Sequence, residues 1–174
     1  SLRSFIPIGV RKCLYRPFTP SWMYFDSHFN NCIYKIPKVF PYAGSENFFI
    51  YINGSGNSGK PFSALITEIT PDLNSQHSGG QGFPLYLYEP IEQAAPADDL
   101  FSRSDDGLDS PQQPQYTRRD AITDDGLAHF ADYYASQTNG QTEQPAISKE
   151  DLFYYIYGLL HSEDYRSRYA DNLS

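Results

Sequence analysis

Apolar residues in the last quarter of the chain recur at the spacing of an amphipathic helix. The positions that would form its buried face are Leu152, Phe153, Ile156, Leu159 and Leu160. Ser148 precedes them as a favourable N-cap, and Asp151 is placed to form a capping-box-like pair with it. Ile147, immediately before the cap, can pack on Leu152 as a hydrophobic staple. This pattern predicts a helix that begins after Ser148 and buries one face.

A second helix is predicted directly after the first. Ser162 is a favourable N-cap, and two acidic residues follow it in the first turn, where the helix dipole favours negative charge. We therefore expect residues 147–173 to form a helical hairpin whose two helices meet near His161 and Ser162. Glycine costs roughly 1 kcal/mol relative to alanine inside a helix, so we expect Gly158 to lie where two helices approach closely.

The first half of the chain has a different pattern, in which short runs rich in β-branched and aromatic residues alternate with turn formers. These runs are residues 5–10, 22–26, 32–35, 48–53, 64–69 and 85–88. Proline, glycine and asparagine separate them, as is typical of strands joined by turns. Asn30 and Asn31 stand between two runs and indicate a hairpin turn. The pattern predicts a small mixed or antiparallel sheet.

Residues 91–119 are polar and contain few apolar anchors. Prolines at 96, 111 and 114 fall in this stretch, together with several aspartate, serine and glutamine residues. Such a composition cannot bury enough apolar surface to offset the entropy of ordering the chain. We therefore expect residues 91–119 to form a flexible loop, and we expect removal of residues 93–116 to leave the fold intact.

A further helix is predicted between this loop and the C-terminal hairpin. Thr123 is placed to cap it, and Ile122 is placed to pack on Leu127. Its buried face would contain Leu127, Phe130, Ala131 and Tyr134. A β-rich N-terminal half followed by helices predicts an α+β fold. A chain of 174 residues has the length of one domain, so we expect residues 1–174 to form a single domain.

Charge is distributed unevenly along the chain, which has a net charge of −8. Residues 1–60 hold seven basic and two acidic residues, whereas residues 61–174 hold six basic and nineteen acidic residues. A negative net charge argues against nucleic-acid binding. The basic N-terminal part instead favours one surface that faces a polyanion. Ordinary solvated charge is the alternative.

One stretch has the spacing of a phosphate-binding loop. Residues 54–60 spell Gly-Ser-Gly-Asn-Ser-Gly-Lys after a predicted strand. The next residue is Pro61, where a P-loop requires Ser or Thr for magnesium, so nucleotide binding is not expected there. The backbone amides and Lys60 could still approach a DNA phosphate. The alternative is a glycine-rich turn before the next strand.

The sequence offers no pattern typical of a metal centre or a catalytic site. None of the four histidines has a cysteine, histidine or carboxylate partner at metal-ligand spacing. Cys13 and Cys32 make neither a metal spacing nor a disulfide framework, which indicates buried thiols in a cytoplasmic protein. No apolar run reaches the roughly 20 residues that a membrane span needs.

Four blocks of sequence carry a resemblance to a known family. They are residues 15–18 with 22–25, residues 60–67, residues 83–89 and, most specifically, residues 151–173. Together, and in this order, they resemble the C-terminal specificity region of Type ISP restriction-modification enzymes. The resemblance implies that the chain is part of a longer enzyme and recognises double-stranded DNA for it.

The same resemblance implies that the enzymatic chemistry lies elsewhere in the parent enzyme. The chain lacks a glycine-rich S-adenosylmethionine (SAM) turn, an Asn-Pro-Pro-Tyr-like tetrapeptide, and helicase and nuclease motifs. We therefore expect no catalysis and no cofactor in this chain, with SAM, ATP and magnesium used only in the rest of the parent. The expected partners are double-stranded DNA and the methyltransferase domain of the same polypeptide.

The candidate DNA contacts combine basic residues of the N-terminal part with a glycine-rich loop. They are Arg11, Lys12, Arg16, Lys35, Lys60, Gln76, His77 and Gln81. Arginine can bind guanine or phosphate bidentately, and amides recognise adenine edges. Arg16 could instead stack on aromatic rings or pair with a carboxylate, and the loop could simply be solvated. A second function stays open, in which the Tyr-rich helices dock on the methyltransferase with little direct base contact.

Overall fold

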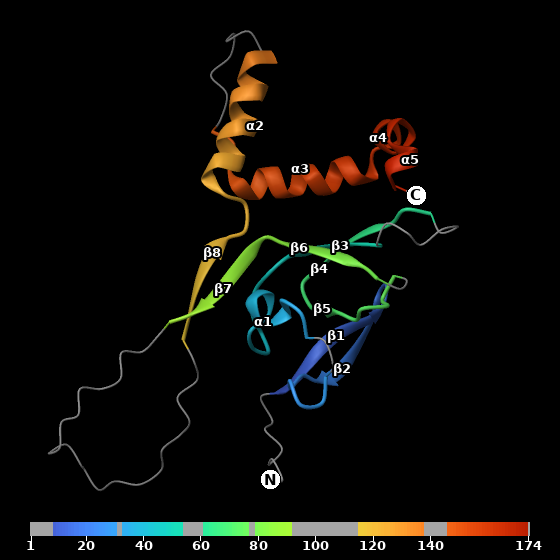
Figure 1. Ribbon diagram of the computed structural model, residues 1–174, viewed down its shortest axis with the longest axis vertical. Coiled ribbons are helices and arrows are strands. Elements are labelled where there is room, and N and C mark those ends of the chain that lie inside the picture. Colours follow the sequence, from blue (N-terminus) through green and yellow to red (C-terminus); the bar gives the residue numbers. More distant parts are fainter. Residues whose placement is uncertain are drawn as a thin grey trace, which may run out of the picture.

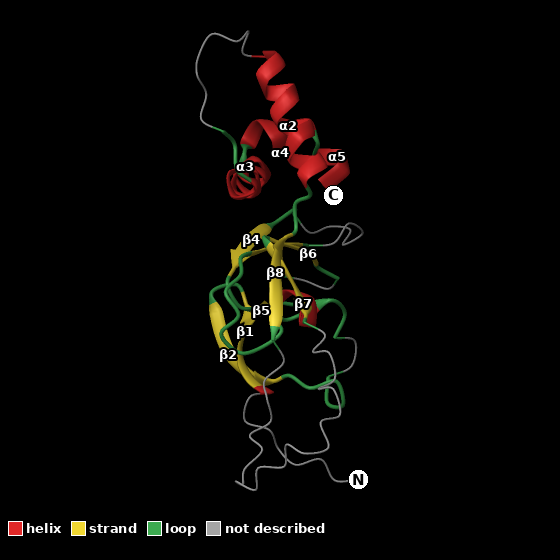
Figure 2. Cartoon of the chain, turned by 90° about the vertical axis from the view of Figure 1, so that its left-hand side faces the viewer, coloured by secondary structure: helices red, strands yellow, loops and turns green. Residues whose placement is uncertain are grey.

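The computed structural model describes residues 9–30, 33–53, 61–76, 79–91, 115–137 and 146–173. Within these ranges a β-rich part is followed by helices that lie together at one end of the molecule (Figure 1). Figure 2 shows the same separation from the side, with the strands below the helices. The predicted α+β class is therefore confirmed. No described helix is long and apolar enough to cross a membrane.

The first sheet is a hairpin with one short added strand. β1 (Val10–Arg16) pairs with β2 (Thr19–Tyr24) in an antiparallel register, and β5 (Thr70–Pro71) adds to β1 in parallel. A strand was predicted at residues 5–10, but the described part begins at residue 9, so residues 5–8 of this strand lie outside it. The strand that is present continues through residues 11–16, which the sequence did not predict. Its basic residues interrupt the apolar pattern, and a strand with one solvated face tolerates such residues.

The second sheet has β3 (Phe49–Ile52) at its centre. β4 (Ala64–Thr67) and β6 (Gln81–Pro84) pair with β3 on either side, both antiparallel. The strands predicted at 48–53 and 64–69 are therefore confirmed, with slightly shorter bounds. β6 was not predicted, because a glycine and a proline in a strand of this length leave no clear alternation.

Side chains of β3 alternate between the two faces of this sheet, as successive residues of a strand do. One face packs in a cluster with α1 (Ile36–Val39) and the residue that follows it, made of Val39, Phe40, Phe49 and Tyr51. The other face packs with α3 (Lys149–His161) in a cluster made of Ile50, Leu85 and Phe153. The sheet is thus the layer that joins the β-rich part to the helices.

The strand predicted at 32–35 and the hairpin turn predicted at Asn30 and Asn31 are wrong. A local turn follows β2, in which Asn30 Oδ1 accepts a hydrogen bond of 2.8 Å from the Asp26 backbone N–H. Residues 31 and 32 lie outside the described part, and α1 follows at Ile36. Pro37 lies in the first turn of α1, where its missing N–H costs nothing. Burial of Val39 overrides the β propensity of this short run.

A third sheet, made of two strands, corrects the flexible loop predicted at residues 91–119. β7 (Tyr86–Pro90) pairs with β8 (Tyr116–Asp120) in an antiparallel ribbon, so residues 116–119 belong to a strand. Residues 92–114 lie outside the described part. The sequence did not reveal β8 because most of its residues are polar or charged and exposed. Its pairing with β7 is a long-range contact that local patterns do not report.

The helix predicted after Thr123 is α2 (Asp124–Gln137). The Gly126 N–H donates to Thr123 Oγ1 at 3.1 Å, which confirms the predicted cap. The predicted capping box of α3 is also present, since Ser148 Oγ accepts from the Asp151 N–H at 3.1 Å and Asp151 Oδ2 accepts from the Ser148 N–H at 2.9 Å. Leu152 and Phe153 of the predicted apolar face of α3 are buried. Two residues predicted to be buried are instead exposed, namely Ile156 on α3 and Tyr134 on α2.

The C-terminal segment differs from the predicted two-helix hairpin. The break at Ser162 is where it was expected, and Ser162 caps α4 (Glu163–Arg168). Tyr169 then ends α4, and a short α5 (Ala170–Leu173) follows. The expectation for Gly158 is wrong, because a Cβ built there meets no atom within 4 Å.

Candidate functional site

An exposed face of the β1–β2 hairpin pairs basic with aromatic side chains. Lys12 Nζ lies 5.8 Å from the centre of the Trp22 ring, directly across the hairpin. At the end of β1, the Arg16 guanidinium carbon lies 4.4 Å from the centre of the Tyr15 ring. Both rings are largely exposed, at 67% for Trp22 and 52% for Tyr15. Each ring therefore holds a cation in a defined place at the surface of the protein.

Arg16 also joins the tip of the hairpin to a loop far along the chain. Its Nη1 donates to the carbonyl oxygens of Tyr15 at 2.9 Å and of Asn74 at 3.1 Å. The loop is held in turn by Asp72, whose Oδ1 accepts from the Asn74 N–H at 2.8 Å. Arg16 thus stacks on an aromatic ring, which the sequence analysis gave as the alternative to a DNA contact. The residue nevertheless remains exposed.

The loop that Arg16 contacts leads into β6, where Gln81 lies. Gln81 is exposed and faces Ile52 of β3 in the register of the second sheet. Gly79, just before it, has φ +80°, a conformation that glycine adopts without strain. Gln81 therefore lies at the start of a strand whose backbone is fixed by pairing. Its side chain is exposed and lies on the same face of the sheet as Ile52, opposite the face that carries Phe49 and Tyr51.

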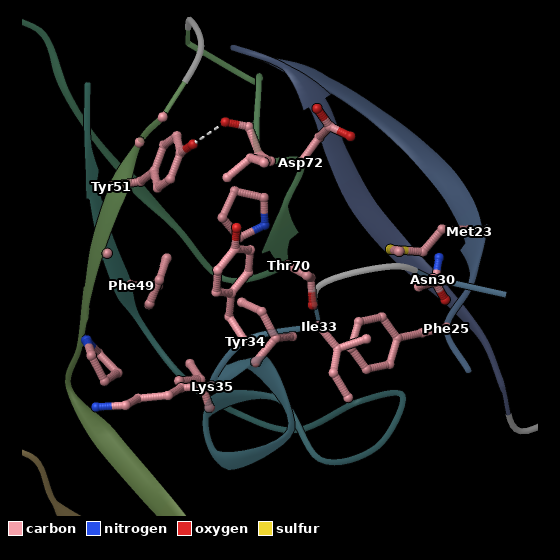
Figure 3. Close-up of a pocket in the computed structure, with 18 of the residues that line it drawn as sticks. Met23, Phe25, Asn30, Ile33, Tyr34, Lys35, Phe49, Tyr51, Thr70 and Asp72 are labelled. Atoms are coloured by element: carbon pink, nitrogen blue, oxygen red, sulfur yellow. Dashed lines mark hydrogen bonds between the residues drawn. The ribbon is translucent and has the colours of Figure 1, made fainter. Parts of the chain in front are cut away.

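A cleft of about 620 Å³ opens between the first two sheets and α1. In Figure 3, Tyr34 stands in the middle of the cleft, with Lys35 at one end and Asp72 at the other. The Tyr51 hydroxyl closes one wall by donating to the Leu73 carbonyl at 2.7 Å. Lys35 is exposed beside α1. The predicted contacts Lys35 and the loop before Gln81 are thereby brought to the same cleft.

Two glycines allow the start of β6 to lie directly against aromatic rings of β3. A Cβ at Gly80 would overlap the Tyr51 ring, and a Cβ at Gly82 would overlap the Phe49 ring. These rings stack on each other, with centroids 6.3 Å apart and an interplanar angle of 21°. The glycine content of this region is therefore required by packing at two positions. It is not the composition of an ordinary solvated loop.

Arg11, a predicted DNA contact, is instead a buried residue of the core. Its side chain is 8% exposed, its Nη1 donates to the Phe40 carbonyl at 2.6 Å, and its guanidinium carbon lies 4.4 Å from the centre of the Phe25 ring. Burial lowers the pKa of Arg11 from its ordinary value. These contacts join β1 to the end of α1, so we remove Arg11 from the DNA-contact set.

Gln76, predicted to contact bases, is also committed to the fold. It is 8% exposed, and its amide nitrogen donates to the Tyr51 carbonyl at 3.1 Å. Its amide oxygen accepts from the Ser63 hydroxyl at 2.9 Å. Both ends of the amide are therefore used within the protein. The sequence could not reveal this, because Tyr51 and Ser63 lie 25 and 13 positions away in the chain.

Four of the predicted residues remain as exposed candidates: Lys12, Arg16, Lys35 and Gln81. Lys60 and His77 lie outside the described residues. Among the described carboxylates, none forms an ion pair with Lys12, Arg16 or Lys35. These three positive charges are thus not neutralised by the described part of the protein, which is the property a phosphate-binding surface requires.

Two exposed aromatic residues in this region were missed by the sequence analysis. Phe18 at the hairpin tip has φ +60° and Tyr34 in the cleft has φ +47°. In the part of the chain that is described, they are the two residues other than glycine with positive φ. Pro17 before Phe18 was a signal for a turn, but nothing in the sequence indicated which side chain the turn would present.

The other described titratable groups do not form a metal-binding site. Across the six described ranges, no group of three or more histidine, cysteine, aspartate and glutamate residues is arranged to hold a metal ion. Cys13 is a buried thiol, and burial raises its pKa above the ordinary value. A thiol with a raised pKa is a poor nucleophile, so its contribution is to packing.

The molecule is therefore an α+β module whose β-rich part presents cations and aromatic rings on the β1–β2 hairpin and Lys35 at a nearby cleft. The model of the Type ISP C-terminal specificity domain matches residues 3–174, and the chain belongs to that family. This confirms the resemblance identified in the sequence. Among curated proteins, none matches the chain significantly.

Three solved structures resemble the whole chain. One is described as the ATP-dependent Type ISP restriction-modification enzyme LlaBIII bound to DNA, with 28% identity, a TM-score of 0.70 and 99% of this chain covered. A second is the cryoEM structure of a DrdV–DNA complex, with 32% identity, a TM-score of 0.73 and 98% covered. The third is a nuclease-deletion mutant of the Type ISP enzyme LlaGI in complex with a DNA substrate mimic, with 25% identity, a TM-score of 0.65 and 100% covered.

The chain is short relative to these structures. It spans 9% of the LlaBIII chain, 14% of the DrdV chain and 12% of the LlaGI chain. The similarity therefore concerns one region of much longer proteins.

Proposed function

We propose that this chain recognises a short sequence in double-stranded DNA and positions it for a methyltransferase and a nuclease located elsewhere in a parent restriction-modification enzyme. Membership of the specificity-domain family supports this proposal, and the three similar structures are described as complexes with DNA. The observation that carries it is the set of exposed cations without described ion-pair partners, Lys12, Arg16 and Lys35, in a part of the molecule that also exposes Gln81.

The two kinds of side chain have different tasks in this proposal. Lys12, Arg16 and Lys35 bind phosphates and supply affinity that does not depend on sequence. Gln81 contacts a base edge, because an amide can donate and accept at once and so favours adenine. Its place at the start of a paired strand fixes where that contact falls. Lys60 and His77 remain proposed contacts from the sequence alone.

In this proposal the chain itself carries out no chemistry. SAM, ATP and magnesium are used by the rest of the parent enzyme, which acts in the cytoplasm. The chain contributes the choice of target, and the neighbouring methyltransferase domain completes the grip on the duplex.

A second candidate function is docking on the methyltransferase through the helices. The observation that favours it is a group of exposed tyrosines on α2 and α3, namely Tyr133, Tyr134, Tyr154 and Tyr155. Tyrosine is enriched at protein interfaces because its ring buries a large area while its hydroxyl keeps a polar partner. Docking by the helices and DNA recognition by the β-rich part are compatible in one molecule.

The experiment is an exchange of this region between two enzymes. Residues 1–174 are replaced, in the natural polypeptide that contains them, by the corresponding region of LlaBIII, and the methylated sequence is mapped on genomic DNA. Recognition by this chain predicts that the hybrid methylates the LlaBIII target. A hybrid that is active but keeps the original target contradicts the proposal and leaves docking as the function.

A further inference from the structure

Phe18 occupies an unusual place for a large apolar side chain. It lies at the tip of the β1–β2 hairpin, in the two-residue connection between Arg16 and Thr19, and it is 86% exposed. Its φ is +60°, in the left-handed region that L-residues with bulky side chains rarely adopt. Phe18 therefore combines an unfavourable backbone conformation with an apolar ring held in water.

The turn itself does not require a phenylalanine. Proline fixes its own φ near −65°, so Pro17 suits the first central position of a type I or a type II turn, and of these two only type II has a positive φ at the next residue, as Phe18 does. Glycine or asparagine would satisfy this second position with less strain. Neither the backbone nor packing within the described protein therefore accounts for the ring. A contact outside the described part of the protein is the remaining reason to place an aromatic residue there.

The surroundings of Phe18 indicate the kind of partner. The guanidinium of Arg16, two residues away, is held at the surface by the Tyr15 ring and the Asn74 carbonyl. Further along the same hairpin, Lys12 and the exposed Trp22 form a second cation–aromatic pair. An apolar tip beside cations matches a stack of bases flanked by phosphates, since base faces accept aromatic rings and phosphates accept the charges.

We propose that Phe18 is a wedge that inserts at one base step of the bound duplex and partly unstacks it. This inference rests on the proposed function and adds the mode in which the hairpin meets DNA. Proteins that insert apolar side chains between base steps kink the duplex and so expose more of it to contact. The stiff Pro17 turn and the paired strands behind it keep the ring extended before DNA arrives. Insertion then costs little ordering of the protein.

The test uses the natural polypeptide and a duplex containing its mapped target, with 2-aminopurine placed in turn at each adenine. The fluorescence of this base rises when it is unstacked. The variants are Phe18→Gly, which suits the turn but removes the ring, and Phe18→Leu, which keeps an apolar wedge. Phe29→Gly is the matched control, because Phe29 is also exposed, at 71%, but follows the opposite end of β2.

We expect the wild type, Phe18→Leu and Phe29→Gly to raise the fluorescence at one particular step. Phe18→Gly should lose that signal and bind about tenfold more weakly, which is the scale of one base–aromatic stacking contact. Its melting temperature should not fall. A base flipped by the methyltransferase would fluoresce with every variant, so it is distinguished from the wedge.

Two outcomes would overturn the wedge and leave the proposed function standing. One is selective binding with a fluorescence pattern that does not depend on Phe18. The other is a fall in the melting temperature of Phe18→Gly below that of the wild type, which would show that the ring packs within the protein. Failure of the wild type to bind any duplex would instead remove the proposed function and the wedge together.

Discussion

Arg16 Nη1 lies 3.1 Å from the carbonyl oxygen of Asn74, a residue 58 positions further along the chain. This hydrogen bond fixes the tip of the β1–β2 hairpin against the loop that leads to Gln81. Arg16, a side chain proposed to bind phosphate, is thereby joined to the segment of chain that precedes Gln81, a side chain proposed to contact a base. The distance between phosphate and base contacts sets the register on DNA, so this bond belongs to the proposed recognition surface.

Lys35 provides the test of the electrostatic part of this surface. In Lys35→Glu, binding should weaken on all duplexes alike, and the slope of log affinity against log salt should fall by about one for the lost phosphate contact. Fluorescence anisotropy over a salt series measures both. Arg168→Glu, an equal charge change on the exposed surface of α4, is the control and should leave the slope unchanged. An unchanged slope in Lys35→Glu would remove Lys35 from the interface.

Gln81 and Gln76 should respond differently to the same substitution. Gln81→Ala should relax sequence preference by about 1–3 kcal/mol at one base position, with little effect on melting, because the amide faces outward. Gln76→Ala should instead reduce the free energy of unfolding by about 1–3 kcal/mol, because it leaves the buried Tyr51 carbonyl without its donor. Competition binding with single-base variants and thermal melting separate the two effects. Similar effects of both substitutions would refute this distinction.

Gly158 should be replaceable. Because a Cβ there meets nothing, Gly158→Ala should raise the free energy of unfolding by about 1 kcal/mol through helix propensity alone. Gly82→Ala is the contrasting variant, since its Cβ would overlap the Phe49 ring and should destabilise the protein. Thermal melting of the two variants compares them directly. Destabilisation by Gly158→Ala would mean that α3 has a partner on that face.

Stability at low pH should depend on Lys149, which joins α3 to two other elements. Its Nζ lies 2.6 Å from Asp124 Oδ1 at the start of α2 and 3.3 Å from Asp120 Oδ2 at the end of β8. The hydrogen bond from Lys149 holds the pKa of Asp124 below its ordinary value of 3.8. The unfolded chain therefore binds the proton more readily. This stabilisation is complete above pH 3.8 and is lost as the pH falls through the lower, folded pKa.

Lys149→Met should remove the part of the pH dependence of stability that arises from the lowered pKa of Asp124. We expect the melting temperature of the wild type to fall more steeply than that of the variant as the pH is lowered from about 5 to below the folded pKa of Asp124. Melting curves across this range provide the comparison, and the capping box at Asp151, unchanged in the variant, contributes equally to both proteins. Parallel curves would show that the pair adds nothing to stability.

The sequence predicted the parts of the fold that depend on local patterns. The caps at Thr123 and Ser148 and the strands β3 and β4 follow from residues close together in the chain. β8 did not, because its polar residues gain their strand conformation by pairing with β7. Prediction of the candidate site from the sequence was limited in the same way. Composition identified a basic half, but only the packing shows that Arg11 is buried under Phe40 and Phe25 whereas Lys12 faces solvent.

The most direct test of the account is hydrogen–deuterium exchange of the natural polypeptide with and without a duplex containing its mapped target. DNA recognition by the β-rich part predicts slower exchange in residues 12–18 and 79–83 on binding, with little change in α2 and α3. A duplex lacking the target should protect these segments less. Protection confined to α2 and α3, or none in the β1–β2 hairpin, would contradict the account.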